Sequence, residues 1–185
     1  MAKVLVTGGT IRVGKAIADH LRSLGHEVVA SSHRPEAGPS LDCLDVNDFD
    51  VIINNAALYL GEPTLVKRVN YDIPVAVCEA KTHGQVINIL DGTSHPAPWK
   101  KELAEYTVGR VAPRPPAVTE SPPYHPPRCR VNGILLGPVL PPDGFHLKAD
   151  PCPKGRPTVN DVAKAVVKLV EDKDANHLII DVTGR

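Results

Sequence analysis

The chain has 185 residues, of which 21 are Lys or Arg and 21 are Asp or Glu, so its formal net charge at pH 7 is zero. A neutral chain lacks the strong positive field of a nucleic-acid-binding protein, and we expect no nucleic-acid partner. No apolar run reaches the length of a membrane-spanning helix, so we expect no membrane partner either. The sequence opens on a predicted strand without a leader peptide, which predicts a cytoplasmic protein.

The length predicts a single domain spanning residues 1–185. The four cysteines are widely spaced and form no Cys-x-x-Cys pair, so we expect reduced, partly buried thiols. The eight histidines include no pair four residues apart. We therefore predict no metal site.

The segment Lys3–Gly14 predicts a strand, a tight glycine turn and the start of a helix. Val4-Leu5-Val6 is a short apolar run bounded by turn residues, as in a buried strand. The turn and the helix that follows direct free backbone N–H groups, and the positive helix end, at one point. This arrangement predicts a phosphate-binding turn, although a purely structural glycine turn in another α/β protein has the same pattern.

The spacing Gly8-x-x-x-Arg12-x-Gly14 resembles the turn of the short-chain dehydrogenase/reductases, Thr-Gly-x-x-x-Gly-x-Gly. In their pteridine reductase branch an arginine replaces the middle glycine, as Arg12 does here. The resemblance implies an α/β fold with a Rossmann-like, doubly wound parallel sheet, here shortened and with some helices trimmed. It also implies that the turn holds a dinucleotide through these residues: Gly8, Thr10, Ile11, Arg12, Val13 and Gly14.

The second predicted strand is Val28–Ser31. In a dinucleotide-binding βαβ unit, the residue at the end of this strand contacts the adenosine ribose. An acid there bonds the 2′-hydroxyl of NAD, whereas an arginine favours the 2′-phosphate of NADP. The chain has no acid at this point, and His33-Arg34 resembles the basic pair of the NADPH-preferring pteridine reductases. We therefore predict NADP(H) as the cofactor, bound through His33 and Arg34. A solvated His-Arg pair without a ligand is the alternative.

Leu41–Val46 and Val51–Ala57 predict the third and fourth strands. The segments before them, Pro35–Ser40 and Asn47–Asp50, leave room for little more than turns, whereas the family has full helices there. We therefore expect two trimmed helices.

Two features of these strands match the family at cofactor-binding positions. Asp45 matches its acid near the adenine ring. Asn54-Asn55-Ala56 matches its Asn-Asn-Ala-Gly motif, with Ala57 in place of the glycine. The resemblance implies that Asn55 and Ala56 line the cofactor.

Thr64–Ala80 predicts a helix with an apolar stripe. Pro74 has no N–H, so the carbonyl of Asn70, four residues earlier, loses its helical partner. In the family, the matching asparagine holds a water that completes a proton relay, which implies that Asn70 belongs to the active site. A simple proline kink is the alternative.

Gln85–Leu90 predicts the fifth strand and ends at Asp91, where the pteridine reductases also carry an aspartate. A helix is expected from about Pro98, and it places Tyr106 and Arg110 one turn apart on one face. The family's motif there is Tyr-x-x-x-Lys, so an arginine replaces the lysine. The resemblance implies that Tyr106 donates a proton and that Arg110 lowers its pKa. Asp91 either binds a pterin ring, moves a proton or serves only as a turn residue.

Arg130–Pro138 resembles the family's sixth strand, and Gly137 and Pro138 are expected at the cofactor. Asn160 is expected to cap the last helix, and Leu178–Val182 to form a seventh strand. The proline-rich segment 113–127 cannot be helical and is expected to run over the surface. The loop Val139–Pro157 is expected to cover the substrate pocket.

Two functions remain open at this point. The first is an NADPH-dependent reductase that transfers a hydride to a pteridine-like (dihydropteridine) or other small carbonyl or imine substrate, and the retained Tyr106, Asp91 and Asn70 favour it. The second is a catalytically impaired NADP(H)-binding sensor or interaction protein, which the change to Arg110 and the trimmed helices favour. The family pairs its Asn70 and Tyr106 helices across a two-fold axis, which implies a homodimer or homotetramer.

Overall fold

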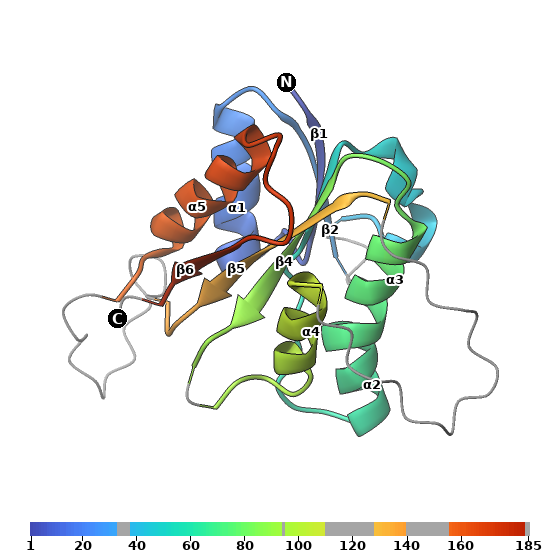
Figure 1. Ribbon diagram of the computed structural model, residues 1–185, viewed down its shortest axis with the longest axis vertical. Helices are drawn as coiled ribbons and strands as arrows, with labels where there is room; N and C mark the ends of the chain where they lie inside the picture. The colour runs from blue at the N-terminus through green and yellow to red at the C-terminus, as the bar shows by residue number, and fades with distance from the viewer. Residues whose placement is uncertain (33–37, 94, 110–127, 140–155, 184–185) are drawn as a thin grey trace.

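The computed structural model describes residues 1–32, 38–93, 95–109, 128–139 and 156–183. Within them, six strands form one parallel sheet in the order β2-β1-β3-β4-β5-β6 (Figure 1). The strands are β1 (Lys3–Thr7), β2 (Glu27–Ser31), β3 (Val51–Asn54), β4 (Gln85–Asp91), β5 (Arg130–Leu136) and β6 (Ile179–Val182). The strand order reverses between β1 and β3, which makes this the point where an open α/β sheet binds its ligand.

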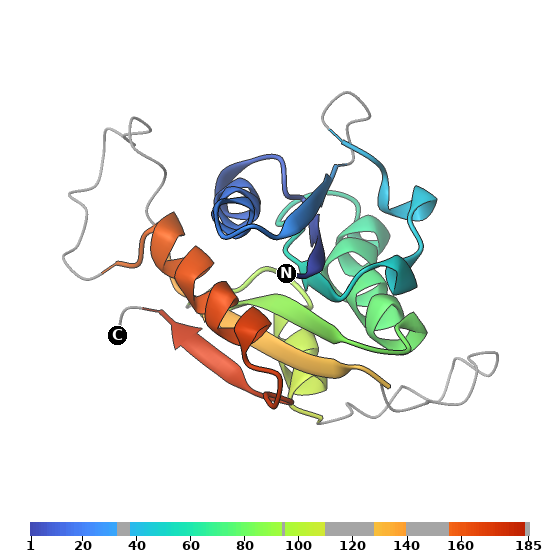
Figure 2. The ribbon, with the colours of Figure 1, turned by 90° about the horizontal axis from the view of Figure 1, so that it is seen from above.

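Helices cover both faces of the sheet. On one face lie α1 (Arg12–Ser23) and α5 (Val159–Glu171), and on the other lie α2 (Pro63–Lys67), α3 (Ile73–Ala80) and α4 (Lys100–Thr107) (Figure 2). A five-residue π-helical turn, η3 (Arg68–Asp72), joins α2 to α3. The described residues contain no helix that is both long and apolar enough to cross a membrane.

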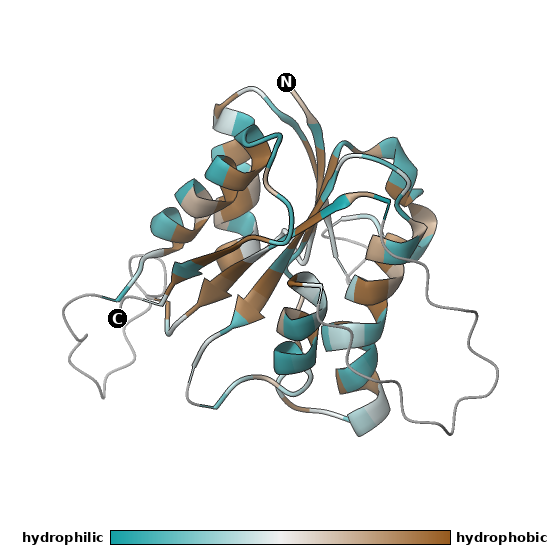
Figure 3. Cartoon of the chain, in the orientation of Figure 1, coloured by the Kyte–Doolittle hydropathy of each residue, from teal (hydrophilic) through white to brown (hydrophobic). Residues whose placement is uncertain are grey.

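The sheet is buried on both sides because its side chains alternate between two apolar layers. Val4 and Val6 of β1 pack with α1 and α5, whereas Leu5 between them packs with α3 and α4. Hydrophobic residues accordingly dominate the central strands (Figure 3). Parallel strands covered on both faces need such continuous apolar runs, and the sequence supplies them.

The predicted α/β fold with a doubly wound parallel sheet is confirmed, but the third strand is wrong. Residues 41–46 form no strand; they contain η1 (Leu41–Cys43) and lead into η2 (Val46–Asp48), two short 3₁₀ turns. Only residues 32–40 separate the end of β2 from Leu41. A parallel crossover needs about a dozen residues, so this link is too short to return the chain beside β2.

Three helix boundaries also differ from those expected. The helix predicted over 64–80 is divided by η3 at Asn70, and α4 begins at Lys100 rather than at Pro98. The N-cap of α5 is Thr158, not Asn160: the Thr158 hydroxyl accepts from the N–H of Asp161, whose carboxylate accepts from the N–H of Thr158. This reciprocal pair satisfies two of the free donors at the helix start. The proline-rich segment 113–127 and most of the loop 139–157 lie outside the described residues.

Candidate functional site

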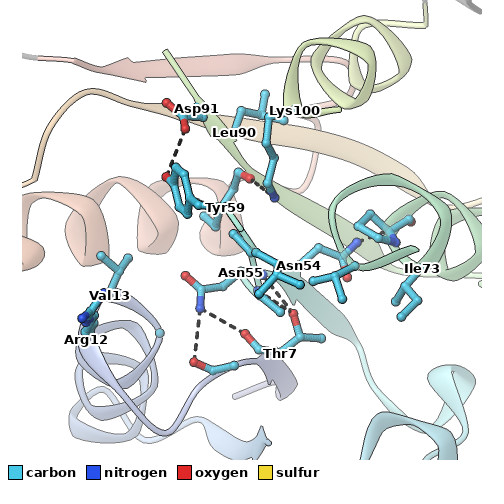
Figure 4. A pocket seen from close by; sticks show the side chains of 18 of the residues that line it. Thr7, Arg12, Val13, Asn54, Asn55, Tyr59, Ile73, Leu90, Asp91 and Lys100 are labelled. Atoms are coloured by element: carbon cyan, nitrogen blue, oxygen red, sulfur yellow. Dashed lines mark hydrogen bonds between the residues drawn. The ribbon is translucent and has the colours of Figure 1, made fainter. Parts of the chain in front are cut away.

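A pocket of about 890 Å³ lies at the carboxyl ends of the strands (Figure 4). The residues that end or follow β1, β2, β3, β4 and β5 all contribute to its wall, as does the first turn of α1. It therefore spans the switch point between β1 and β3.

The start of α1 and the turn before it have the geometry of a phosphate cradle. Ile11, the N-cap residue, makes no side-chain cap, and the first turn carries no acidic side chain. Gly8 has φ +61°, and a Cβ on Gly14 would lie 2.2 Å from the carbonyl oxygen of Gly8. Both positions therefore require glycine. The free N–H groups of the helix start, together with the positive helix end, face the pocket and favour an anion.

Thr7 and Asn55 hold this turn against the segment after β3. The Thr7 hydroxyl accepts from the backbone N–H groups of Asn55 (3.0 Å) and Ala56 (3.1 Å). The Asn55 side-chain amide donates to the carbonyl oxygens of Thr7 (3.1 Å) and Gly8 (3.2 Å). These bonds join the carboxyl ends of β1 and β3 and fix the cradle.

Asp91 lies at the end of β4 with its carboxylate fully engaged. One oxygen accepts from the N–H (3.0 Å) and hydroxyl (2.6 Å) of Thr93, and the other from the N–H of Ala97 (2.9 Å) and the hydroxyl of Tyr59 (3.0 Å). Burial by itself would raise the pKa of Asp91, but these hydrogen bonds outweigh it and lower the pKa below its ordinary value. Asp91 is therefore ionised at neutral pH, with about four lone-pair positions filled.

Tyr59 reaches Asp91 from the loop after β3 and lines the same pocket. Partial burial and the negative charge of Asp91 raise the pKa of Tyr59 to about 12. The phenol is therefore neutral at physiological pH and directs its proton at the carboxylate.

Lys100, the first residue of α4, also lines the pocket. The residue is only 2% exposed, and its Nζ donates to the carbonyl oxygen of Ile89 (3.1 Å). Burial lowers the pKa of Lys100 to about 8, although the charge of Asp91 opposes this shift. In Figure 4, Asp91, Tyr59 and Lys100 gather at one end of the pocket, away from Arg12 and Val13 on α1. We call these three residues the Asp91 cluster.

The structure does not bring Tyr106 to the pocket. Tyr106 is 7% exposed and packs in the apolar layer between the sheet and α4, next to residues such as Leu103 and Val131. The N-terminal end of α4 faces the pocket, and Tyr106 lies six residues further, about 9 Å along the helix axis. Tyr106 is not among the described residues that line the pocket, and its part in proton transfer stays a prediction. Arg110 lies outside the described residues.

Lys100 is the residue of α4 that sequence reasoning missed. The match to Tyr-x-x-x-Lys rested on Tyr106. If Lys100 is taken as the lysine of that motif, the tyrosine position falls on Pro96. The inward face of α4, which Lys100 shares with Leu103 and Thr107, is the signal that would have found it.

Asn70 lies in η3, where the helix departs from α geometry as Pro74 led us to expect. Its side chain is fully buried and connects the loop after β3 to the segment before α4. The Asn70 amide nitrogen donates to the carbonyl oxygens of Leu58 (2.6 Å) and Pro98 (3.0 Å), and its amide oxygen accepts from the N–H of Leu58 (2.8 Å). Asn70 does not itself line the pocket. Its contacts support the pocket wall, and its part in a proton relay stays a prediction.

Most of the predicted cofactor residues meet at this pocket. Those that line it are Gly8, Ile11, Arg12, Val13, Gly14, Asn55, Ala56, Gly137 and Pro138. Thr10 and Asp45 do not; the Asp45 carboxylate instead accepts from the N–H of Asn47 (2.8 Å) and caps η2. Asp42 of η1 lines the pocket in its place. His33 and Arg34 lie outside the described residues.

No protein-family model matches the chain, and no curated protein matches it. Solved structures do. The alternative dihydrofolate reductase 1 FolM from Brucella suis, in complex with NADP, is 23% identical, with 98% of this chain and 93% of that chain covered at a TM-score of 0.65. A blue fluorescent protein from a metagenomic library, in complex with NADPH, is 19% identical, with 98% and 96% covered at a TM-score of 0.68. A short-chain dehydrogenase/reductase family protein is 19% identical, with 97% and 94% covered at a TM-score of 0.70.

The chain has the short-chain dehydrogenase/reductase fold. The similarity extends over nearly the whole of this chain and of the matched chains, although the identities are below 25%. In this fold, the pocket at the switch point between β1 and β3 is where a dinucleotide would lie.

The residues present fit such a ligand. The cradle leaves no room for a Cβ at Gly14, and its helix start carries no acid that would repel a phosphate. Asn54 also lines the pocket. Its side chain donates to Asn88 (2.8 Å), while its Oδ1 is buried and has no hydrogen-bond partner among the described residues. The described residues contain no cluster of metal ligands.

Proposed function

We propose that the protein is an NADPH-dependent reductase that transfers a hydride to a pteridine-like substrate or another small carbonyl or imine compound. One observation carries the proposal: the phosphate cradle and the Asp91 cluster open into the same pocket. An anion site alone would suit many ligands. A dinucleotide that transfers a hydride also needs a second polar site at the strand ends, where its nicotinamide ring can meet the substrate.

The cofactor would be held mainly by backbone groups of the cradle and by two arginines. The N–H groups at the start of α1 and the guanidinium of Arg12 would hold the pyrophosphate. Arg34, which follows β2, would bind the 2′-phosphate with His33. When bound, NADPH supplies a hydride.

The substrate would lie against the Asp91 cluster. Since the Asp91 carboxylate is engaged on both oxygens, its proposed role is to orient Tyr59, whose phenol oxygen keeps lone pairs for an N–H donor of the substrate. A pterin ring carries an amino group and ring N–H groups that suit such an acceptor.

The alternative function is an NADP(H)-binding sensor or interaction protein without catalysis. Tyr106 favours this alternative. The resemblance implies that Tyr106 is the proton donor, but it packs in the core and not at the pocket.

A fluorescence titration followed by a substrate panel separates the two functions. We expect NADPH to bind and its absorbance at 340 nm to fall with a quinonoid dihydropterin, dihydrobiopterin or a small quinone. Tight NADPH binding with no oxidation by any of them would support the sensor.

In the same titration, Arg34→Ala should weaken the binding of NADPH strongly and that of NADH little, since only NADPH carries the 2′-phosphate. An equal loss of affinity for both cofactors would contradict the assignment.

The proposal includes a cytoplasmic homodimer or homotetramer. Three large apolar side chains near the starts of α2 and α4 are exposed, namely Leu60, Leu65 and Trp99. Light scattering after gel filtration measures the oligomeric state, and a monomer at micromolar concentration would contradict this part.

A further inference from the structure

A carbonyl or imine reduction needs a proton as well as a hydride, and the tyrosine expected to give it is not at the pocket. Tyr106 packs in the core beneath α4. The proposed function therefore leaves one chemical role unassigned.

Asp91 and Tyr59 are poorly suited to donate. Asp91 is ionised and accepts four hydrogen bonds, so it carries no proton to give. Tyr59 has one proton, and it points at Asp91. Giving that proton away would leave a phenolate beside a carboxylate, and two adjacent negative charges repel each other.

The other pocket groups are no better suited. Arg12 and Arg68 line the pocket, but a guanidinium keeps its proton throughout the physiological range. The hydroxyls of the serines and threonines in the wall are much weaker acids than an ammonium. Of the cationic side chains among the described lining residues, this leaves Lys100.

Lys100 meets the geometric requirement. Its side chain is buried, reaches the pocket and is anchored by one bond from Nζ to the carbonyl of Ile89. An ammonium has three donors, so two N–H bonds remain for other acceptors. We propose that Lys100 is the proton donor of the reaction, acting directly on the substrate rather than through a tyrosine.

The substrate carbon would gain a C–H bond and two electrons as the hydride from NADPH, whose own C–H bond breaks as it is oxidised to NADP⁺, and the carbon's π bond to oxygen or nitrogen opens. One N–H bond at Lys100 Nζ breaks, and a new N–H or O–H bond forms at the substrate's nitrogen or oxygen. Lys100 is left as a neutral amine and takes a proton back from solvent. This inference rests on the proposed reductase function.

The electrostatic surroundings support the role. Burial lowers the pKa of Lys100 to about 8, so the group is protonated at neutral pH and yet loses its proton readily. Asp91 from β4 is the charged group that acts on it, and its charge limits the shift. Tyr59 from the loop after β3 and Arg68 from η3 share the pocket, and Tyr71 and Asp72 continue η3 beside α4.

The test compares Lys100→Arg with Lys101→Met and Tyr106→Phe. Arginine keeps the positive charge but cannot give up a proton, so hydride transfer in a stopped-flow experiment should fall by about 10²–10⁴-fold while NADPH binding changes little. The exposed neighbour Lys101 and the buried Tyr106 should give nearly normal rates. In the wild type the rate should fall as pH rises through about 8, because the acid is then deprotonated.

A second measurement needs no turnover. In wild-type protein with ¹³C-labelled lysines, one side chain should titrate near pH 8 in the absence of any ligand, and its signal should be missing from Lys100→Arg. A Lys100 that titrates above pH 10, or a Lys100→Arg rate within tenfold of the wild type, would overturn the donor role and leave the reductase standing. A wild type that binds NADPH and reduces nothing would instead overturn the proposed function, and the donor role with it.

Discussion

At the scale of single residues, Arg12 has a backbone conformation that suits glycine better. Its φ of 48° lies in the left-handed region, which costs an ordinary residue about 1–2 kcal/mol. The side chain is exposed and borders the pocket beside the cradle. A guanidinium at a strained position next to an anion site is best explained by a role in binding.

Replacing Arg12 by glycine should separate stability from binding. The relief of left-handed strain opposes the extra entropy of glycine in the unfolded chain, about 0.5–1 kcal/mol, so the free energy of unfolding should stay the same or rise by up to about 1.5 kcal/mol. NADPH affinity should fall more than tenfold, because a charge-assisted phosphate contact is lost. Urea denaturation and a fluorescence titration measure the two effects. Arg22→Ala, at the far end of α1, is the control and should keep its affinity; a large loss of stability in Arg12→Gly would argue against strain.

Asp91 makes the stability of the protein depend on pH in a defined direction. Its pKa is lower in the folded protein than the unfolded value of about 3.9, so its contribution is present above that value and is lost as pH falls through the folded pKa. Asp91→Asn removes the charge at every pH. We therefore expect the variant to be less stable than the wild type at pH 7 and the difference to shrink below about pH 4. A difference that is constant from pH 7 to pH 3, measured by urea denaturation, would show that the carboxylate charge is irrelevant.

At the scale of elements, the cradle depends on how closely α1 approaches the turn before it. A methyl group on Gly14 would lie 2.2 Å from the Gly8 carbonyl oxygen and 2.5 Å from the Asn55 amide nitrogen. Gly14→Ala must therefore push the turn and the helix apart. We expect a loss of about 1–3 kcal/mol of stability, as for other overpacked sites, together with loss of NADPH binding. Lys15→Ala, on the exposed side of the same turn, is the matched control, and normal NADPH binding by Gly14→Ala would exclude a cradle at this position.

The strands also show why part of the fold could be predicted from the sequence. Buried parallel strands are rich in apolar residues. Val51-Ile52-Ile53 is such a run, and Val86–Leu90 is another that only Asn88 interrupts. Leu41–Val46 carries apolar residues too, but its place in the sheet depended on the length of the link from β2. That length was visible in the sequence, and it excludes a crossover.

The candidate site was predictable only in part, for a physical reason. The glycines and the Asn54-Asn55-Ala56 segment are tied to backbone geometry, so local spacing predicts their place at the strand ends. Which side chain of α4 reaches the pocket depends instead on where that helix begins and which end faces the strands. In the structure, α4 begins at Lys100, and Tyr106, six residues further along the helix, packs in the apolar layer. The sequence carries no strong signal for that start.

At the scale of the whole molecule, NADPH should stabilise the fold because it would bind only the assembled pocket. At a ligand concentration one hundred times its Kd, mass action adds about 2.7 kcal/mol. For a chain of this size that corresponds to a rise in Tm of roughly 5–11 °C. A thermal unfolding series measures it, with NADH as the control for the 2′-phosphate. An equal shift with NADH, or none with NADPH, would contradict the cofactor assignment.

The parallel sheet has a further consequence for how the chain reaches its native state. All neighbouring strands are parallel, so none of the described pairs is closed by a hairpin, and β4 and β5 are separated by the residues between Asp91 and Arg130. Such pairs close only after long loops have been ordered, which makes folding slow, on the scale of milliseconds to seconds. During that time the apolar strands are exposed to other chains. The pocket, built from the ends of five strands, is therefore completed only when nearly the whole sheet has formed.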